Sequence, residues 1–310
     1  MAADEPDLPR GIALAWGVAA DPQRGPKREM SVERIVDAAV ELADAEGLAA
    51  VSMAAVASRL GYTPMSLYRY VSAKDDLLLL MQEEAIGLPP ELDPDAEPGW
   101  RARLAQLYRA QVAGFVAHPW MLSIPIQGSP VTPNSSAWLD AALEALASTP
   151  LSHEERVAVS LLISGQARFA GMVLAGYADR MRTSGQSPDD VTAEEVALYD
   201  SLVTADEYPA LREAIEAGVF ASEADPFAFG MERGFDGVAA YIAALEAGAA
   251  RTEAAERVET EDAALLADRR YREAQRAVRV AQKALRDARK AERLVRREAA
   301  ERIARSRRDS

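Results

Sequence analysis

Apolar residues recur every three or four positions along most of the chain, which is the spacing of one face of an α-helix. The spacing is clear near the N-terminus, at Val32, Ile35, Val36, Ala39 and Val40. Long runs of Ala, Leu, Glu and Arg, which favour helices, fill much of the remainder, and no stretch shows the alternation typical of a strand. The sequence therefore predicts an all-α fold.

Breaks in this pattern divide the chain into four segments. Residues 1–30 are expected to form a flexible arm with a basic end, and residues 31–87 form a compact three-helix unit with a connecting helix. An acidic, proline-rich linker, 88–99, leads to a helical bundle over residues 100–248. Residues 251–310 consist almost wholly of charged residues and helix formers, which predicts a long charged helix.

The compact unit contains the signals of two short helices joined by a tight turn. Ser52 and Gly61 bound the first of them, because Ser is a favoured N-cap and Gly a favoured stop. Thr63 is placed to cap the second, and Pro64 then occupies the first helical position, where proline is tolerated. Two short helices joined at a glycine predict a helix-turn-helix.

The second of these helices should expose an unusual surface. Leu67 and Val71 are spaced to face the core, which leaves Met65, Tyr68 and Arg69 on the outside. In a helix-turn-helix this helix enters the major groove of DNA, where Arg can bond guanine edges and apolar groups can touch thymine methyls. We therefore expect these three side chains to read sequence.

Two further residues are placed to bind phosphate. Ser52 lies at a helix N-terminus, and Lys74 follows Ser72, which we expect to cap the next helix in a capping box with Asp75. Such contacts would position the protein on the DNA backbone without reading sequence. The same pattern is also compatible with a plain helical hairpin whose exposed aromatic residues contact another protein.

The run LGYTPMSLYRYVSAKDDLL, residues 60–78, closely resembles the recognition helix and following helix of the tetracycline-repressor (TetR) family. The resemblance combines a glycine turn, Leu-Tyr at the helix centre and a lysine two residues past the cap. It implies DNA contacts at the matching positions, which are Ser52, Thr63, Pro64, Met65, Tyr68, Arg69, Tyr70 and Lys74. The arm's basic end, with Lys27 and Arg28, resembles arms that hold such proteins on the DNA backbone, although a solvated linker explains it equally well.

Residues 100–248 resemble the regulatory domain of the same family through HPWMLSIPI (118–126), YPALREAIEAG (208–218) and DPFAFGMERGFDG (225–237). The resemblance implies a bundle that dimerises through its last helices. It also implies an apolar pocket for a small-molecule effector, of unknown identity, whose binding releases double-stranded operator DNA. A mixture of aromatic and a few polar residues suits such a pocket, and the candidates for its lining are Tyr108, Gln111, Phe115, His118, Trp120, Trp138, Gln166, Phe169 and Met172.

An apolar seam near the end of this domain favours helix packing. Its members alternate at intervals of four and three residues, which suits packing either within the chain or between two copies. Because a twofold operator needs two DNA-reading units, we expect a homodimer interface formed by Met231, Phe235, Val238, Ile242 and Leu245.

Charge is distributed unevenly along the chain. The net charge of −14 is unusual for a DNA-binding protein, but residues 269–310 contain 16 basic and 6 acidic residues, a local charge of +10. The rest of the chain then has 19 basic and 43 acidic residues, a local charge of −24. The basic tail could contact DNA flanking the operator or fold onto the acidic remainder, and the charge difference favours the second.

Several classes of function are disfavoured. The chain has no cysteine, which excludes disulfides and thiolate chemistry and fits a reducing cytoplasm. Its two histidines, His118 and His153, lack a metal-site spacing, so neither metal nor cofactor is expected. No apolar stretch looks long and clean enough to span a membrane, and no acid–base group marks an enzyme. The sequence thus predicts a DNA-binding regulator, with an interaction scaffold or architectural DNA-binding protein that uses the basic tail as the alternative.

Overall fold

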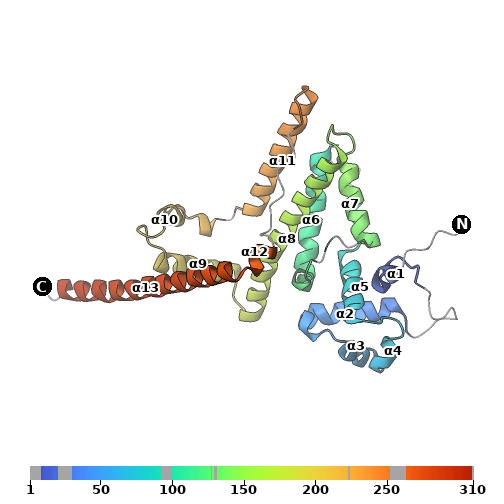
Figure 1. Ribbon diagram of the computed structural model, residues 1–310, viewed down its shortest axis with the longest axis horizontal. Helices are drawn as coiled ribbons and strands as arrows, with labels where there is room; N and C mark the ends of the chain where they lie inside the picture. Colours follow the sequence, from blue (N-terminus) through green and yellow to red (C-terminus); the bar gives the residue numbers. More distant parts are fainter. Residues whose placement is uncertain are drawn as a thin grey trace. The chain divides into compact units, whose positions relative to one another are not determined.

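The computed structural model describes residues 8–19, 30–91, 99–126, 128, 131–222, 224–251 and 263–308, and over these ranges the chain forms helices and turns without a strand (Figure 1). The all-α prediction is confirmed. The chain divides into two compact units, Met1–Ala250 and Arg251–Ser310.

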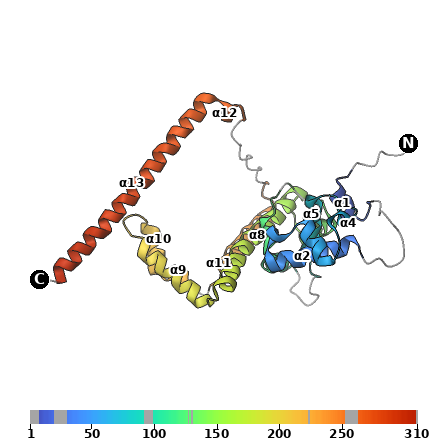
Figure 2. The ribbon, with the colours of Figure 1, turned by 90° about the horizontal axis from the view of Figure 1, so that it is seen from below.

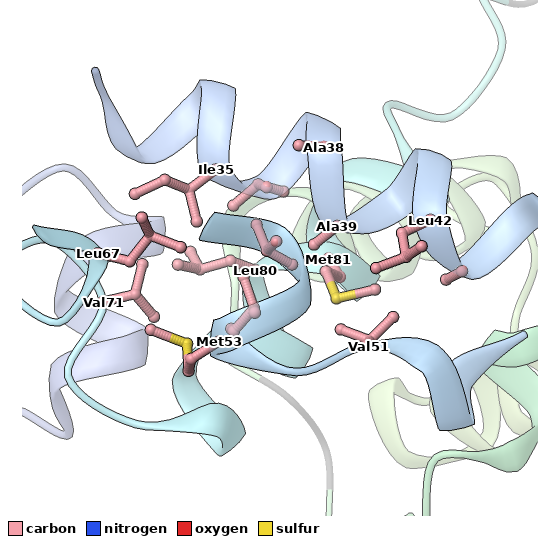
Figure 3. Close-up of a cluster of buried hydrophobic side chains, with 14 of the residues drawn as sticks. Ile35, Ala38, Ala39, Leu42, Val51, Met53, Leu67, Val71, Leu80 and Met81 are labelled. Carbon is pink, nitrogen blue, oxygen red and sulfur yellow. The ribbon is translucent and has the colours of Figure 1, made fainter. Parts of the chain in front are cut away.

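The N-terminal part of the first unit contains the helix-turn-helix expected from the sequence, and we refer to residues 30–91, which are expected to read DNA, as the reading head. Its elements, together with the helix that precedes it, are α1 (Arg10–Ala15), α2 (Val32–Glu46), the 3-10 turn η1 (Leu48–Ala50), α3 (Met53–Leu60), α4 (Pro64–Leu67) and α5 (Lys74–Ile86). Figure 3 shows Ile35 of α2, Met53 of α3, Leu67 of α4 and Met81 of α5 pointing into one buried cluster. This shared core fixes the short helices relative to one another.

The helix ends follow the sequence signals at some positions and depart from them at others. Ser52 Oγ accepts a hydrogen bond from the Ala55 N–H at 3.1 Å, and Gly61 ends α3 in the left-handed conformation with φ 77°. Thr63 occupies the N-cap of α4, but its hydroxyl lies 3.0 Å from Ser66 Oγ and caps no backbone N–H. At α3 and α4 the capping pattern thus predicts the N-cap residue correctly, but at α4 it does not predict the hydrogen bond that forms there.

The capping box predicted at Ser72 and Asp75 is wrong. Helix α5 begins one residue later, with Ala73 at the N-cap and no side-chain cap. Ser72 Oγ instead donates to Asp76 Oδ2 at 2.9 Å, so its hydroxyl is used one turn into the helix.

Part of the predicted flexible arm is folded. Helix α1 packs against α5, and Gly11 lies so close that a Cβ there would be 2.9 Å from Asp76 Oδ1. Trp16 Nε1 donates to the carbonyl of Val131 at 2.8 Å. A helix of six residues is too short to give a clear periodic signal, which explains why the pattern did not reveal it. Lys27 and Arg28 lie outside the described residues.

We refer to the rest of the first unit, from residue 99 onward, as the regulatory domain, after the role that the sequence resemblance implies for it. Its elements are α6 (Trp100–Ala117), η2 (Pro119–Ser123), α7 (Pro133–Ala145), α8 (His153–Ser184), α9 (Pro188–Leu202), α10 (Pro209–Glu216), η3 (Val219–Ala221) and α11 (Pro226–Glu246). Helices α6, α7, α8 and α11 enclose a second core around Leu104, Leu146 and Phe235.

Two contacts give the direction in which α11 runs along α8. Phe227 packs edge-on against Phe169 with ring centroids 5.7 Å apart, and the Tyr241 hydroxyl donates to Glu155 Oε1 at 2.7 Å. The order of these pairs makes the two helices antiparallel. Helix α9 turns away at an angle from the C-terminal end of α8 (Figure 2), and near that end Arg180 pairs with Glu195 at 3.0 Å.

The second unit contains α12 (Ala263–Ala267) and α13 (Arg269–Arg308). Helix α13 is continuous over 40 residues, which corresponds to about 60 Å at 1.5 Å per residue. The long charged helix predicted from the sequence is therefore present.

Gly171 gives a test of the packing between α6 and α8. A Cβ at Gly171 would lie 2.6 Å from Phe115 Cβ, an atom held close to the α6 backbone. We expect Gly171→Ala to force the helices apart and to lower the free energy of unfolding by about 1–3 kcal/mol, measured by urea denaturation.

Gly114→Ala is the matched control, because an added Cβ on this α6 residue meets nothing within 4 Å. It should raise the free energy of unfolding by about 0.5–1 kcal/mol, since Ala favours helix more than Gly. Equal stability of the two variants would contradict the close approach at Gly171.

Candidate nucleic-acid interface and regulatory domain

The surface predicted to read DNA is exposed on and after α4. Leu67 and Val71 are fully buried and hold this segment to the core, while Met65 is 70% and Tyr68 46% exposed. Thr63, Pro64 and Arg69 are also exposed, whereas Tyr70 is half-buried against the core. The structure thus brings Thr63, Pro64, Met65, Tyr68 and Arg69 together on the outside and turns Tyr70 partly inward.

The turn before α4 is held firmly to its neighbours. The Tyr62 N–H donates to the carbonyl of Ala57 at 2.9 Å, directly after the left-handed Gly61. Arg59 of α3 pairs with Glu41 of α2 at 2.9 Å. The direction of α4 therefore follows from the positions of α2 and α3.

The two predicted phosphate contacts are both exposed at helix starts. Lys74 is the first residue of α5, and Ser52 is the N-cap of α3. Helix N-termini carry partial positive charge and free N–H groups, so both positions suit an anion.

Asp44, near the end of α2, joins the reading head to the regulatory domain. Its Oδ1 lies 2.8 Å from His118 Nδ1 and accepts a hydrogen bond from Trp120 Nε1 at 2.6 Å. Trp120 is only 4% exposed, and it packs with Met121 and Ile124 in the core of the reading head. The η2 turn of the regulatory domain is therefore built into the reading head.

A second junction connects α5 to α7. The Asn134 N–H donates to Glu83 Oε1 at 2.5 Å, and Trp138 Nε1 donates to the carbonyl of Gly87 at 2.9 Å. The N-cap of α7, Thr132, makes no side-chain cap bond. A carboxylate is favourable at a helix N-terminus, so Glu83 of the reading head caps a helix of the regulatory domain.

Arg168 on α8 extends the first junction into the regulatory domain. Its Nη2 donates to the carbonyls of Leu122 at 3.0 Å and Ile124 at 3.3 Å, and its guanidinium lies 5.7 Å from the centre of the Phe115 ring. Burial lowers the pKa of the Arg168 guanidinium. Hydrogen bonds thus lead from α8 through η2 to Asp44 on α2.

The residues predicted to line a pocket occupy several different environments. Tyr108 is buried in the regulatory core, where burial and then the nearby Asp225 charge raise the pKa of its hydroxyl. Phe169 and Met172 are 51% and 53% exposed. The remainder are partly buried or lie at the two junctions: Gln111, Phe115, Gln166, His118, Trp120 and Trp138.

Sequence reasoning missed Asp44, Glu83 and Arg168. Their partners lie 44 to 76 positions away along the chain, so no local spacing marks them. The useful signal was in the aromatic residues, because a buried Trp N–H normally has an acceptor.

The seam predicted as a homodimer interface lies inside the chain, which corrects that assignment. Met231, Phe235 and Ile242 are 3%, 1% and 7% exposed, and Val238 and Leu245 pack against the same core. The seam packs against other helices of the same chain. Packing within a chain and packing between two copies require the same apolar spacing, so the sequence could not distinguish them.

An apolar surface is exposed on α8 instead. The exposed residues follow one another at intervals of four, one, three, four and three positions, and they are Val157, Leu161, Leu162, Gly165, Phe169 and Met172. By length and composition α8 could cross a membrane, contrary to the expectation from the sequence. Its other side, with Ile163, Ala167 and Ala170, belongs to the regulatory core, as in a core helix of a folded bundle.

Comparison with known proteins places both domains in one family. Residues 35–81 match the family described as bacterial regulatory proteins, tetR family, and residues 93–242 match the tetracyclin repressor-like C-terminal domain. The solved structure of the TetR family protein ActR from Streptomyces coelicolor in complex with (S)-DNPA is similar, with 25% identity and a TM-score of 0.51. The match covers 72% of this chain and 100% of that chain.

Curated relatives agree. The HTH-type transcriptional repressor DrrR1 of Streptomyces coeruleorubidus is 32% identical over 238 residues, which is 76% of this chain and 87% of the relative. An HTH-type transcriptional regulator of Saccharopolyspora erythraea is 32% identical over 139 residues, 44% of this chain and 57% of that protein. These relatives are transcriptional regulators rather than enzymes. The chain described here belongs to the tetR family of bacterial regulatory proteins.

Proposed function

We propose that this protein is a dimeric transcriptional repressor that binds a twofold operator in double-stranded DNA and leaves it when a small molecule binds the regulatory domain. The observation that carries the proposal is the surface of Met65, Tyr68 and Arg69, exposed on and directly after α4, the second helix of a helix-turn-helix. The repressor DrrR1, as a relative, supports repression. ActR, solved with (S)-DNPA and with actinorhodin, supports an organic effector acting in the cytoplasm, where operator DNA lies.

Each exposed residue has a distinct role in this proposal. Arg69 can bond a guanine edge, while Met65 and the Tyr68 ring can contact thymine methyls. Lys74 and Ser52 bind phosphates at helix N-termini. Thr63, Pro64 and Tyr70 border this surface, and Lys27 and Arg28 are expected to contact the backbone beside it.

The DNA assignment can be tested with a palindrome selected from random duplex DNA. Arg69→Ala should lose about 1–3 kcal/mol of discrimination at the base pair it contacts. Lys74→Ala should weaken binding to all sequences alike and reduce the slope of log affinity against log salt by about 1 per protomer. Fluorescence anisotropy at several salt concentrations measures both.

Arg109→Ala, on the exposed surface of α6, is the control and should bind like the parent. If Tyr68→Ala and Arg69→Ala both bound the palindrome as tightly as the parent, the α4 surface would not be the reading surface.

The exposed face of α8 is the proposed dimer interface. From Val157 to Met172 the one charged residue is Arg168, and its side chain bonds to Leu122 and Ile124. Gly165 has no side chain, so a partner helix could approach closely at this position. A contiguous apolar face of this kind on a soluble bundle marks an interaction surface. A twofold axis beside α8 would let the same face of each copy cover the other.

A charge on this face should separate the copies. Leu161 is 62% exposed, so Leu161→Glu should not disturb the core but should convert the dimer to monomer. Sedimentation velocity measures the state, and the monomer should lose tight binding to a palindrome while it keeps weak binding to a half-site.

Leu198→Glu supplies the control, because Leu198 is 52% exposed on α9 and lies away from this face. A dimer that persists in Leu161→Glu would place the interface elsewhere.

The Asp44 junction is the proposed route by which the regulatory domain controls the reading head. Arg168 of α8 bonds to the carbonyls of Leu122 and Ile124 at the end of η2. At the start of η2, the Trp120 indole N–H donates to Asp44 of α2. An effector that displaces α8 or η2 would therefore turn α2, and α4 with it. The distance between the two reading surfaces of the dimer would then no longer match the operator.

Asp44→Ala should uncouple this junction. It leaves the Trp120 N–H without its acceptor, so the free energy of unfolding should fall by about 1–3 kcal/mol. Amide hydrogen exchange in η2 should rise in the same variant.

Asp37→Ala, on the exposed side of the same helix, should change stability by no more than about 0.5 kcal/mol. Unchanged exchange in η2 of Asp44→Ala would show that the two domains are held together by other contacts.

A further inference from the structure

One side of α13 carries a row of positive charge. The row contains Arg272, Arg276, Arg279, Lys283, Arg286 and Lys290, at intervals of four, three, four, three and four residues. Such intervals keep side chains on one side of a helix. All six residues are exposed, and the row spans about 27 Å at 1.5 Å per residue.

The opposite side of α13 is apolar and mostly small. It contains Ala277, Ala281, Ala284 and Ala288, with Leu285 at 52% exposure beside them. Between residues 272 and 290 the acidic residues are Glu273 and Asp287, and neither falls on the intervals of the row. Between residues 272 and 290 every basic residue except Arg289 therefore belongs to the row, and small apolar residues occupy the opposite side.

The reading head has the opposite charge balance. Residues 30–91 contain four basic and ten acidic residues, and Arg69 and Lys74 are the basic residues between 60 and 91. Phosphate neutralisation supplies most of the sequence-independent affinity for DNA. A reading head with a net charge of −6 gains little from this source, and the acidic regulatory domain adds repulsion.

We propose that the cationic row of α13 is a second DNA-binding surface, which contacts phosphates outside the base pairs read by α4. The proposal rests on the DNA-binding function of the chain. Duplex DNA carries one negative charge per about 1.7 Å of its axis, so a straight row of six cations can face a continuous series of phosphates. The α4 surface then supplies sequence discrimination, and α13 supplies the electrostatic affinity that the reading head lacks.

Other anionic partners fit α13 less well. Helices that bind at a lipid surface bury Trp, Phe and Leu on their apolar side, and the corresponding side here is mostly Ala. The acidic part of the chain itself is complementary to the row in its net charge, but it does not present the regular series of charges that duplex DNA does. Because that partner would compete with DNA, the two cases give opposite results in a binding experiment.

The test uses the full chain and two duplexes that contain the same selected palindrome. One duplex ends at the palindrome, and the other extends about 20 base pairs beyond each end. The row variant replaces Arg279, Lys283, Arg286 and Lys290 with Gln. The control variant makes the same change of charge off the row, at Arg269, Arg270, Arg289 and Arg302. Since Gln favours helix about as well as Arg and Lys, circular dichroism should show equal helicity.

At low salt the parent should bind the long duplex at least tenfold more tightly than the short one. The row variant should lose this preference, and its salt slope on the long duplex should fall by up to about 4 per protomer. The control variant should keep most of the preference, and both variants should bind the short duplex like the parent.

Three results would overturn the proposal. A row variant that keeps the parent's preference and salt slope rules out phosphate contacts by the row. Tighter binding of the row variant to both duplexes would mean that α13 folds onto the acidic part of the chain. Unchanged DNA binding with loss of binding to phosphatidylserine vesicles would assign the row to lipid. If the parent selects no palindrome at all, the failure is that of the repressor function and not of the row alone.

Discussion

One carboxylate oxygen connects the part of this protein that faces DNA to the part that faces an effector. Asp44 Oδ1 receives the Trp120 indole N–H and lies beside His118, so α2 and η2 meet at a single polar point. Around that point Trp120, Met121 and Ile124 complete the core of the reading head. The hydrogen bond fixes the orientation of η2 relative to α2. The burial of apolar side chains around it supplies most of the free energy that holds the two elements together.

The division of charge gives this protein two separate sources of DNA affinity. The reading head is negatively charged and offers a recognition helix with a few hydrogen-bond donors. Many of the basic residues of the chain lie beyond residue 268. Electrostatic attraction falls steeply with salt, whereas base contacts do not. A regulator built in this way can adjust its general affinity by changes in the tail without altering the residues that select sequence.

Much of the reading head could be predicted from sequence because its signals are local. Ser52, Gly61 and Pro64 each act within one turn of a helix, and the structure places α3 and α4 where they predict. The seam from Met231 to Leu245 shows the limit of such reasoning. Its spacing identified one buried face of a helix, but core within a chain and core between chains bury the same residue types, so the spacing could not name the partner.

The contacts that join the domains were beyond local signals for a different reason. Asp44 and Glu83 are ordinary surface carboxylates by sequence, and they acquire roles only through residues 51 or more positions away. The aromatic residues His118, Trp120 and Trp138 were noticed, but as a pocket lining, because their hydrogen-bond partners could not be known in advance.

The shared core also sets how this protein can exchange parts with its relatives. A recombination event in the linker 88–99 would transfer a reading head without Trp120, Met121 and Ile124, leaving its core incomplete and Asp44 facing an unrelated turn. A hybrid regulator joined at that linker would combine a reading head and a regulatory domain whose contacting residues come from different proteins. A transferred segment that kept the core of the reading head and both junctions intact would have to extend past the linker to about residue 138, where Trp138 Nε1 donates to the carbonyl of Gly87.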